Sequence, residues 1–496
     1  MSGEKESRGA AAGFYTCHEQ PEERALTVKG TIPSYVDGVL YRTGPGRFEV
    51  DKRAISHWFD GKGLNHRFSI SAKDQTVKYR SRESCAVQIE KERKLGRSSA
   101  VTFAQPPDPC QRLFSKFFVA FKTALETGSK REPSDVNVNV VLNTGSKSLT
   151  AQTDANLLQR LDPVTLEPLE ATTYASMLPE LNGPLSAAHG ATMDGTTYNY
   201  VLALGPRPKY TLFHFASDDA RGARVLATIT DAPPAYLHSL AATAKHVVLT
   251  IWQADYKHYG LDILWQGNCL DGLGKWDPKR RTLHYVFDRA TGQRVARVQS
   301  DAFFAFHHIN AFDDDEGSSI VLDLATYADT EVLNTLRVAN MRAFDAATAP
   351  EPRYTRVRLP LKGGHINEAT VSVTAINIEL PCVHPAHQWR AARYAYGVHR
   401  TDAPASRTMF VDAIVRLDME TRETRVWRQE GQVPGEPIFV PGPSGREDDG
   451  ALLTVVLDVA SQSSRLVILD AASLEPVASA DLATVFPNGF HGVFQS

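Results

Sequence analysis

Four histidines far apart in the chain lie in short apolar or aromatic phrases that interrupt the surrounding pattern: His189, His238, His307 and His491. The phrases are A-A-H-G-A, P-A-Y-L-H-S-L, F-F-A-F-H-H-I-N-A-F and P-N-G-F-H-G-V-F. Neutral imidazole is the commonest metal ligand in proteins and suits divalent iron. These residues are therefore candidates for a metal site that contains no carboxylate ligand.

The alternative is that these histidines are ordinary surface or core residues, since the chain contains 16 histidines. Their separations match no compact metal motif such as H-E-x-x-H or paired C-x-x-C. Spacing alone is thus a weak signal. Only a fold that brings four distant segments to one axis would unite them.

Composition restricts the class of protein. The chain has 496 residues, a net charge of −3 and ordinary apolar and charged fractions, and length alone suggests two or three domains. The near-neutral charge argues against a nucleic-acid partner, and no G-x-G-x-x-G or P-loop indicates a nucleotide cofactor. No window of 18 apolar residues predicts a membrane span.

The compartment is predicted from the N-terminus and the cysteines. Residues 1–12 are polar and charged, which indicates a short tail rather than a secretory signal. The cysteines are odd in number and scattered, as expected of reduced thiols in a cytoplasmic protein. They are Cys17, Cys85, Cys110, Cys269 and Cys382.

The pattern along the chain is that of short strands separated by turns. Runs such as T-Y-N-Y-V-L-A-L and L-L-T-V-V-L-D alternate with turn signals, several of which repeat Asp-x-x-Thr or Asp-x-x-Ser, as at Asp162, Asp288 and Asp470. This recurrence favours stacked four-stranded sheets, hence one β-propeller domain over residues 1–496. A pair of β-sandwiches is the alternative. In a propeller, the inner strands of several blades face a shared axis where the histidines could meet.

The clearest helical signal spans residues 107–127, between prolines and Gly128. Phenylalanines recur there at three- and four-residue steps, with lysines among them: Phe114, Phe117, Phe118 and Phe121. A helix packed on the protein explains this face. A helix lying in a membrane interface, where a lipid-soluble substrate is collected, also explains it.

Together with the histidine phrases, the stretches G-V-L-Y-R-T-G-P-G-R-F-E-V (38–50) and H-W-F-D-G-K-G-L-N-H-R-F (57–68) resemble the carotenoid cleavage oxygenase family. The resemblance runs from about Gly30 to Phe494. It is strongest to the β-carotene oxygenases and the retinal pigment epithelium isomerase branch.

The resemblance implies an all-β fold, a seven-bladed β-propeller with a cap of helices and loops over an iron-bearing face. It assigns the Fe(2+) ligands to His189, His238, His307 and His491, with His307 rather than His308 following the aromatic Phe306. The histidines outside these phrases are interpreted as structural: His57, His66, His365, His384 and His387.

The resemblance also implies carboxylates that accept the other ring N–H of three ligands and so orient them. Glu379 in I-E-L-P and Glu436 in G-E-P-I-F-V match two of these positions. The third falls on Asp154 in T-D-A-N, where the family has the longer glutamate. Asp154 is either such an orienting carboxylate or a turn residue.

The implied activity is a dioxygenase reaction in which O2 cleaves a conjugated C=C bond of a carotenoid or apocarotenoid and gives two carbonyl products. Thr153, where stilbene cleavers carry lysine, favours the carotenoid branch. Cleavage of stilbenes or phenylpropanoids to aromatic aldehydes and retinoid isomerohydrolase activity are the alternatives. The partners expected are O2, a hydrophobic alkene and, through the Phe-rich helix, a membrane surface.

Overall fold

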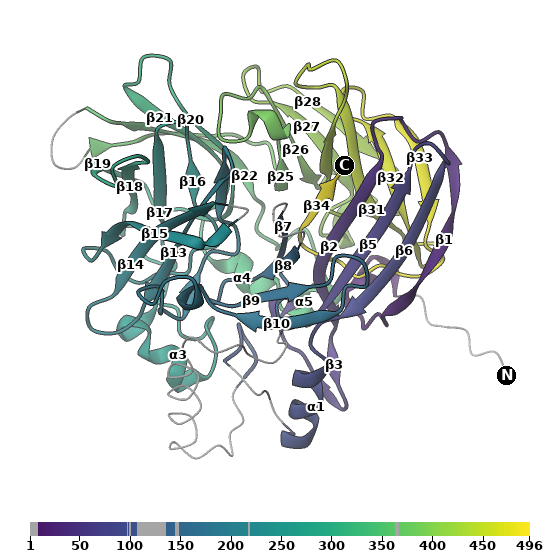
Figure 1. Ribbon diagram of the computed structural model, residues 1–496, viewed down its shortest axis with the longest axis horizontal. Helices are drawn as coiled ribbons and strands as arrows, with labels where there is room; N and C mark the ends of the chain where they lie inside the picture. Colours follow the sequence, from purple (N-terminus) through teal and green to yellow (C-terminus); the bar gives the residue numbers. More distant parts are fainter. Residues whose placement is uncertain are drawn as a thin grey trace.

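The computed structural model describes residues 8–96, 98, 101–106, 135–143, 148–216, 219–362 and 367–496. Strands dominate this part of the chain, and the sheets lie in a ring around a common centre (Figure 1). The fold is all-β, and the arrangement of the sheets is propeller-like, as the sequence predicts. No helix among the described residues is both long and apolar enough to cross a membrane.

Five sheets of four or five strands each form separate blades within the described residues. The first contains β7 (Asn139–Asn143), β8 (Ser148–Gln152), β9 (Leu158–Leu161) and β10 (Pro168–Thr172). The second contains β11 (Leu185–Ser186), β12 (Ala191–Met193), β13 (Thr196–Ala203), β14 (Lys209–Ala216) and β15 (Asp219–Ile229). The third contains β16 (Ala241–Ala242), β17 (His246–Ile251), β18 (Thr282–Asp288), β19 (Arg294–Ser300) and β23 (Asn367–Glu368). The fourth contains β20 (Phe304–Asp313), β21 (Ser319–Tyr327), β22 (Arg353–Pro360) and β24 (Thr370–Val373). The fifth contains β25 (Glu379–Cys382), β26 (Tyr394–His399), β27 (Ala413–Asp418) and β28 (Thr424–Arg428).

A ten-stranded sheet joins the two ends of the chain. Its N-terminal strands are β1 (Gln20–Gly30), β2 (Gly38–Arg47), β5 (Lys62–Ser71) and β6 (Thr76–Glu83). Its C-terminal strands are β29 (Gln432–Pro434), β30 (Ile438–Pro441), β31 (Gly450–Asp458), β32 (Ser463–Asp470), β33 (Pro476–Asp481) and β34 (Gly492–Gln495). The seven separate blades that the sequence predicts are therefore not observed as such, because β1 pairs with both β6 and β33 and fuses their sheets.

Short helices and a small hairpin complete the fold. The helices are α1 (Ala86–Leu95), α3 (Leu261–Gln266), α4 (Glu331–Thr335) and α5 (Val338–Arg342). The 3-10 turns are η1 (Gly9–Phe14), η2 (Trp58–Asp60), η3 (Tyr174–Ser176), η4 (Lys257–Gly260), η5 (Pro385–His387) and η6 (Pro404–Thr408), and the hairpin is β3 (Glu49–Val50) with β4 (Arg53–Ala54). Of the helices that the structure describes, α1 and α3 lie toward the bottom of the view in Figure 1. The polar tail expected over residues 1–12 is structured from Gly9 onward, since η1 buries Ala12 and Phe14.

The predicted Asp-x-x-Thr/Ser turns connect the outer strands of the blades. The Asp288 carboxylate accepts backbone N–H groups from Ala290 and Thr291 between β18 and β19, at 3.1 and 2.8 Å. Asp162 and Asp470 make equivalent bonds between β9 and β10 and between β32 and β33. An aspartate that bonds its own following backbone preorganises a tight turn. The local sequence therefore determines these connections.

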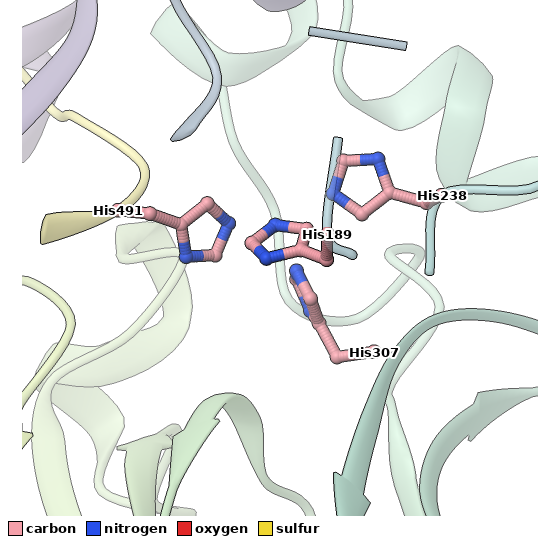
Figure 2. A group of neighbouring side chains, drawn as sticks. All are labelled: His189, His238, His307 and His491. Carbon is pink, nitrogen blue, oxygen red and sulfur yellow. The ribbon is translucent and has the colours of Figure 1, made fainter. Parts of the chain in front are cut away.

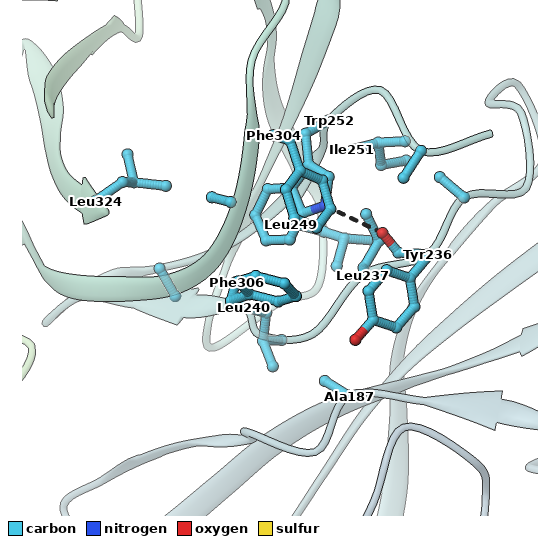
Figure 3. Packing of buried hydrophobic residues seen from close by; sticks show 14 of the residues in the cluster. Ala187, Tyr236, Leu237, Leu240, Leu249, Ile251, Trp252, Phe304, Phe306 and Leu324 are labelled. Carbon is cyan, nitrogen blue, oxygen red and sulfur yellow. Dashed lines mark hydrogen bonds between the residues drawn. The ribbon is translucent and has the colours of Figure 1, made fainter. Parts of the chain in front are cut away.

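An aromatic core fixes the segment that carries His238. Leu237 and Leu240 are each 1% exposed and pack with Trp252 and Phe304, as Figure 3 shows. The Trp252 Nε1–H donates to the backbone oxygen of Tyr236 at 3.0 Å. This bond gives the buried carbonyl a hydrogen-bond partner that it would otherwise lack. The segment before β16 is thus held rigidly although it contains no regular secondary structure.

Candidate metal centre

The four candidate histidines come from four different sheets. His189 lies between β11 and β12, His238 just before β16, His307 within β20 and His491 directly before β34. β11, β16, β20 and β34 each stand at an end of their sheet's strand order. The inner edges of four sheets therefore place one imidazole each at the centre of the ring of sheets.

The four imidazoles converge. One ring nitrogen from each lies within 4.8 Å of those of the other three. Ring centroids are 4.1 Å apart for His189 and His491 and 5.1 Å for His238 and His307, and Figure 2 shows the rings facing a common point. The cluster fits a metal site.

Carboxylates hold three of the rings through Nδ1. Glu379 Oε2 lies 2.6 Å from His307 Nδ1, and Glu436 Oε1 lies 2.7 Å from His491 Nδ1. Asp154 Oδ1 lies 2.9 Å from His238 Nδ1, so the shorter aspartate reaches the imidazole directly. The fourth ring differs, since the atom beside His189 Nδ1 is the amide nitrogen of Asn139 at 3.4 Å.

These contacts decide which nitrogen is free to bind a cation. A carboxylate only accepts, so the proton sits on Nδ1 and the Nε2 lone pair remains available. Among the described residues, Nε2 of His189 and of His307 are buried without a hydrogen-bond partner. Burial, together with the neighbouring rings, lowers the pKa of His189 and of His491 well below the usual value, which keeps both imidazoles neutral. Buried nitrogens without partners are costly, and a bound cation would satisfy them.

Tyrosines and an arginine support the carboxylates. The Tyr236 hydroxyl donates to Asp154 Oδ2 at 2.8 Å, and the Tyr327 hydroxyl donates to Glu379 Oε1 at 3.4 Å. Arg42 Nη1 donates to Glu436 Oε2 at 3.1 Å. Burial raises the pKa of Glu436 to about 7, and the Arg42 charge opposes that rise. None of these three residues is predicted from the sequence, although Tyr236 and Arg42 lie inside phrases singled out above.

The other histidines singled out in the sequence and described by the structure have hydrogen-bond partners outside the cluster. His308 Nδ1 pairs with the Ser239 hydroxyl at 2.8 Å, so its ring turns away from the cluster. His57 Nε2 lies 2.8 Å from the Leu333 oxygen, and His66 Nδ1 lies 2.8 Å from the Tyr79 hydroxyl. His384 and His387 make local backbone contacts. His365 lies outside the described residues.

An apolar cavity of about 50 Å³ borders the cluster. Its lining combines His238, His307 and His491 with aromatic and aliphatic side chains. The apolar part of the lining includes Trp58, Phe59, Phe306, Phe410 and Phe490, and Val332 and Leu336 from the α4 region. Residues of the α4 region thus form part of the cavity wall. The helix predicted at 107–127, with Phe114, Phe117, Phe118 and Phe121, and Cys110 lie outside the described residues.

Comparison with known proteins places this architecture in a family. Residues 13–496 match the family model described as retinal pigment epithelial membrane protein, so the chain belongs to that family, which the sequence analysis identifies through its resemblance to carotenoid cleavage oxygenases. A torulene dioxygenase of Gibberella fujikuroi is 34% identical, over 97% of this chain and 92% of its own length. A mitochondrial carotenoid-cleaving dioxygenase of Macaca fascicularis is 28% identical, over 97% and 93%. The fungal protein is thus more similar than this animal one.

A solved structure shares the fold. Cobalt-substituted Synechocystis apocarotenoid oxygenase superposes with a TM-score of 0.80 over 98% of both chains, at 23% identity. At this identity the likeness establishes the fold alone.

Proposed function

We propose that this protein is a non-haem iron(II) dioxygenase that uses O2 to cleave one conjugated C=C bond of a carotenoid or apocarotenoid. The convergence of four imidazoles beside an apolar cavity carries the proposal. The names of the relatives support it, since those of Gibberella and Macaca are a torulene and a carotenoid-cleaving dioxygenase.

The donor set suits iron(II). Four neutral nitrogens leave the charge of a divalent cation intact, and His189, His238, His307 and His491 would hold it. When bound, iron(II) supplies the binding and activation of dioxygen. The existence of a cobalt-substituted form of the Synechocystis relative is in line with a site for a divalent transition metal.

The reaction needs no acid or base from the protein. One oxygen atom of O2 goes to each carbon of the cleaved double bond, so atoms and electrons balance without a reductant. Asp154, Glu379 and Glu436 orient the imidazoles and keep their Nδ1 protons in place. The aromatic lining orients the alkene and excludes water from the reacting bond.

The cavity favours a polyene over a phenolic alkene. The polar groups in its lining are the histidines, Glu379 and Tyr327, and the Tyr327 hydroxyl already donates to Glu379. A phenol hydroxyl would lose its hydration there, and its candidate partners Glu379 and Tyr327 already bond each other, which makes its entry unfavourable. A hydrocarbon chain has no polar group to desolvate, so it enters the cavity without this cost.

The number of propeller blades is a further part of the proposal. We propose that the ten-stranded sheet represents two blades joined at the β1–β33 pairing, which with the five separate sheets gives seven. β34 and β30 would then be the inner strands of these two blades. This division would place Glu436 and His491 on adjacent blades.

Product identification tests the function. Iron-loaded protein is incubated with β-carotene, an apocarotenal, resveratrol and isoeugenol, and the aldehydes are identified by mass spectrometry. Paired aldehydes from a carotenoid are expected, with both oxygens derived from labelled O2. Aromatic aldehydes alone would favour the stilbene or phenylpropanoid activity, and isomerised retinol released from a retinyl ester in a parallel incubation would favour the isomerohydrolase.

We further propose a cytoplasmic protein that collects its substrate at a membrane surface, a proposal that rests on the phenylalanine pattern of residues 107–127. Replacing Phe114, Phe117 and Phe118 by serine should release the protein from liposomes in a flotation assay, with an unchanged melting temperature. A lower melting temperature with unchanged flotation would instead indicate a face packed on the protein.

A further inference from the structure

A second cavity lies behind the one that borders the histidines. It measures about 40 Å³ and shares three lining residues with the first cavity, Trp58, Leu380 and Phe410. These three side chains therefore form a partition with one cavity on each side. The first cavity contacts the histidines, and the second contacts Arg42 and Asn488.

Neither cavity alone can hold a polyene. Sites for drug-sized ligands enclose roughly 300–1,000 Å³, against about 50 and 40 Å³ here. Cleavage inside a linear chain also requires one arm on each side of the reacting bond. One arm must therefore extend past the metal centre, and side chains must move to admit it.

The partition has two fixed members. Trp58 is 5% exposed, its indole N–H donates to the Asn488 backbone oxygen at 3.0 Å, and its ring packs on Phe490 at a centroid distance of 4.7 Å. Leu380 follows Glu379 directly, and its backbone N–H donates to the Glu379 carboxylate at 2.5 Å. Moving either one would disturb the metal centre or its aromatic wall.

Phe410 is the member that can move at least cost. It lies between η6 and β27, outside regular structure, and is only partly buried. Its ring contacts Trp58 and Phe344 edge to face, at centroid distances of 5.9 and 5.7 Å. Rotation of its side chain would give up these two ring contacts and would connect the cavities.

The second cavity has a donor at its wall. Arg42 Nη2 donates to the Phe490 oxygen at 3.3 Å, which leaves one of its two N–H groups available. Gly435 lines the same cavity, and a methyl group placed on it would lie 3.7 Å from Arg42 Nη2. The glycine thus leaves open space in front of the guanidinium. An oxygen atom at the end of a bound chain could accept a hydrogen bond there.

We propose that Phe410 is a specificity-determining gate, and that the second cavity takes the arm of the polyene beyond the reacting bond, with its oxygen-bearing end near Arg42. The ligand class is a polyene that ends in a carbonyl or hydroxyl group. A bulky hydrocarbon ring at that end fits poorly while Phe410 is in place. This inference rests on the proposed function for the reaction, and on the two cavities for the binding.

Binding to metal-free protein tests the gate without catalysis. Quenching of tryptophan fluorescence by β-carotene and by an apocarotenal in detergent gives the ratio of their affinities. Phe410→Ala should raise relative binding of β-carotene by about tenfold, the lower end of what a change in a hydrophobic pocket achieves. Val411→Phe, which fills only the second cavity, should lower apocarotenal binding by about the same factor.

Phe215→Ala is the matched control, since Phe215 is a buried phenylalanine that packs on Tyr174 and Phe213 and lines neither cavity. Its affinity ratio should match the wild type. An equal ratio of β-carotene to apocarotenal affinity in all three variants would contradict the proposal that Phe410 is a gate. If Phe410→Ala fails to fold, unchanged apocarotenal binding in Val411→Phe contradicts the proposal by itself. Failure of the iron-loaded wild type to release aldehydes from any carotenoid would refute the proposed function. The affinity ratios, which need no catalysis, would still show whether Phe410 controls access to the second cavity.

Discussion

At the scale of single residues, the metal centre depends on histidine–carboxylate pairs rather than on isolated histidines. Three of the four imidazoles contact a buried or half-buried carboxylate through Nδ1. Each pair joins segments that are between 55 and 84 residues apart in the chain. The geometry of the centre is therefore a product of the whole fold, and each ring is oriented by a residue on another segment.

Replacement of any one of the four histidines by alanine should abolish stoichiometric metal binding. Each provides one of four converging donor atoms, and three remaining imidazoles form an incomplete site. Iron content measured by mass spectrometry after reconstitution is the test. His308→Ala is the matched control, because His308 is adjacent to His307 and equally buried but turns toward Ser239. Full iron occupancy in a His189, His238, His307 or His491 variant would remove that residue from the site.

The orienting carboxylates should have smaller effects than the ligands. Glu379→Gln and Glu436→Gln should lose roughly 10–100-fold in metal affinity or activity, as is typical of residues that orient a ligand. Glu436→Gln should also lower the melting temperature, because it leaves the buried Arg42 charge without an opposite charge. Asp154→Ala should lose a similar factor, and Asp154→Glu less, because a carboxylate can still reach His238. Metal titrations compare the four variants. Wild-type affinity in Asp154→Ala would leave Asp154 as a turn residue.

At the scale of elements, local sequence accounts for the outer parts of the blades. The Asp-x-x-Thr/Ser turns at Asp162, Asp288 and Asp470 and strands such as β13 and β31 are where the pattern predicts them. Their signals are local, because an aspartate bonds backbone groups two or three residues ahead. The pairing of β1 with β33 could not be predicted, since a strand's own alternation does not identify a distant partner.

The site was predictable to a similar extent. The histidine phrases and the carboxylates Glu379, Glu436 and Asp154 are visible in the sequence through the family resemblance. Arg42 pairs with Glu436 across 394 residues and lies inside the phrase of residues 38–50. Its role was not predicted from that phrase, because an arginine in a strand is ordinary. The partition between the two cavities depends on the packing of Trp58, Leu380 and Phe410, which no spacing reveals.

A buried ion cluster should control the docking of α1. Lys62 lies 3.2 Å from both Glu92 of α1 and Asp135, and Lys62 and Glu92 are 6% and 2% exposed. Removing one partner of a buried cluster costs about 3–5 kcal/mol, so Lys62→Met should lower the melting temperature strongly. Lys29→Met, which removes an exposed ion pair with Asp481, should change it little.

The stability of the same variant should also depend more strongly on pH than that of the wild type. Burial raises the pKa of Asp135, and Lys62 opposes the rise. Without Lys62, the folded state binds protons more tightly than the unfolded chain, so the stability of Lys62→Met should fall as pH rises above the unfolded carboxylate range. Melting curves at pH 5 and pH 8 measure the difference. An equal deficit at both values would show that the cluster acts through packing alone.

At the scale of the whole molecule, the ends of the chain close the ring. β1 pairs with β33, and β34 pairs with β2, so the C-terminal strands are held by N-terminal ones. His491 directly precedes β34, and its backbone oxygen accepts the Thr43 N–H at 2.9 Å. The fourth imidazole therefore reaches the centre only when both ends of the chain have met.

Deletion of residues 492–496 should consequently reduce metal binding although all four histidines remain. The deletion removes the β34–β2 register, in which Leu40 pairs with Phe494 and Tyr41 with Val493, and His491 loses the strand that fixes its ring. We expect iron occupancy to fall while His189, His238 and His307 keep their positions, because their sheets do not include β34. Deletion of Ser496 alone, which lies beyond the last paired residue Gln495, is the matched control. Full occupancy in the longer deletion would show that Thr43 and Glu436 suffice to hold His491, and that ring closure and metal binding are independent.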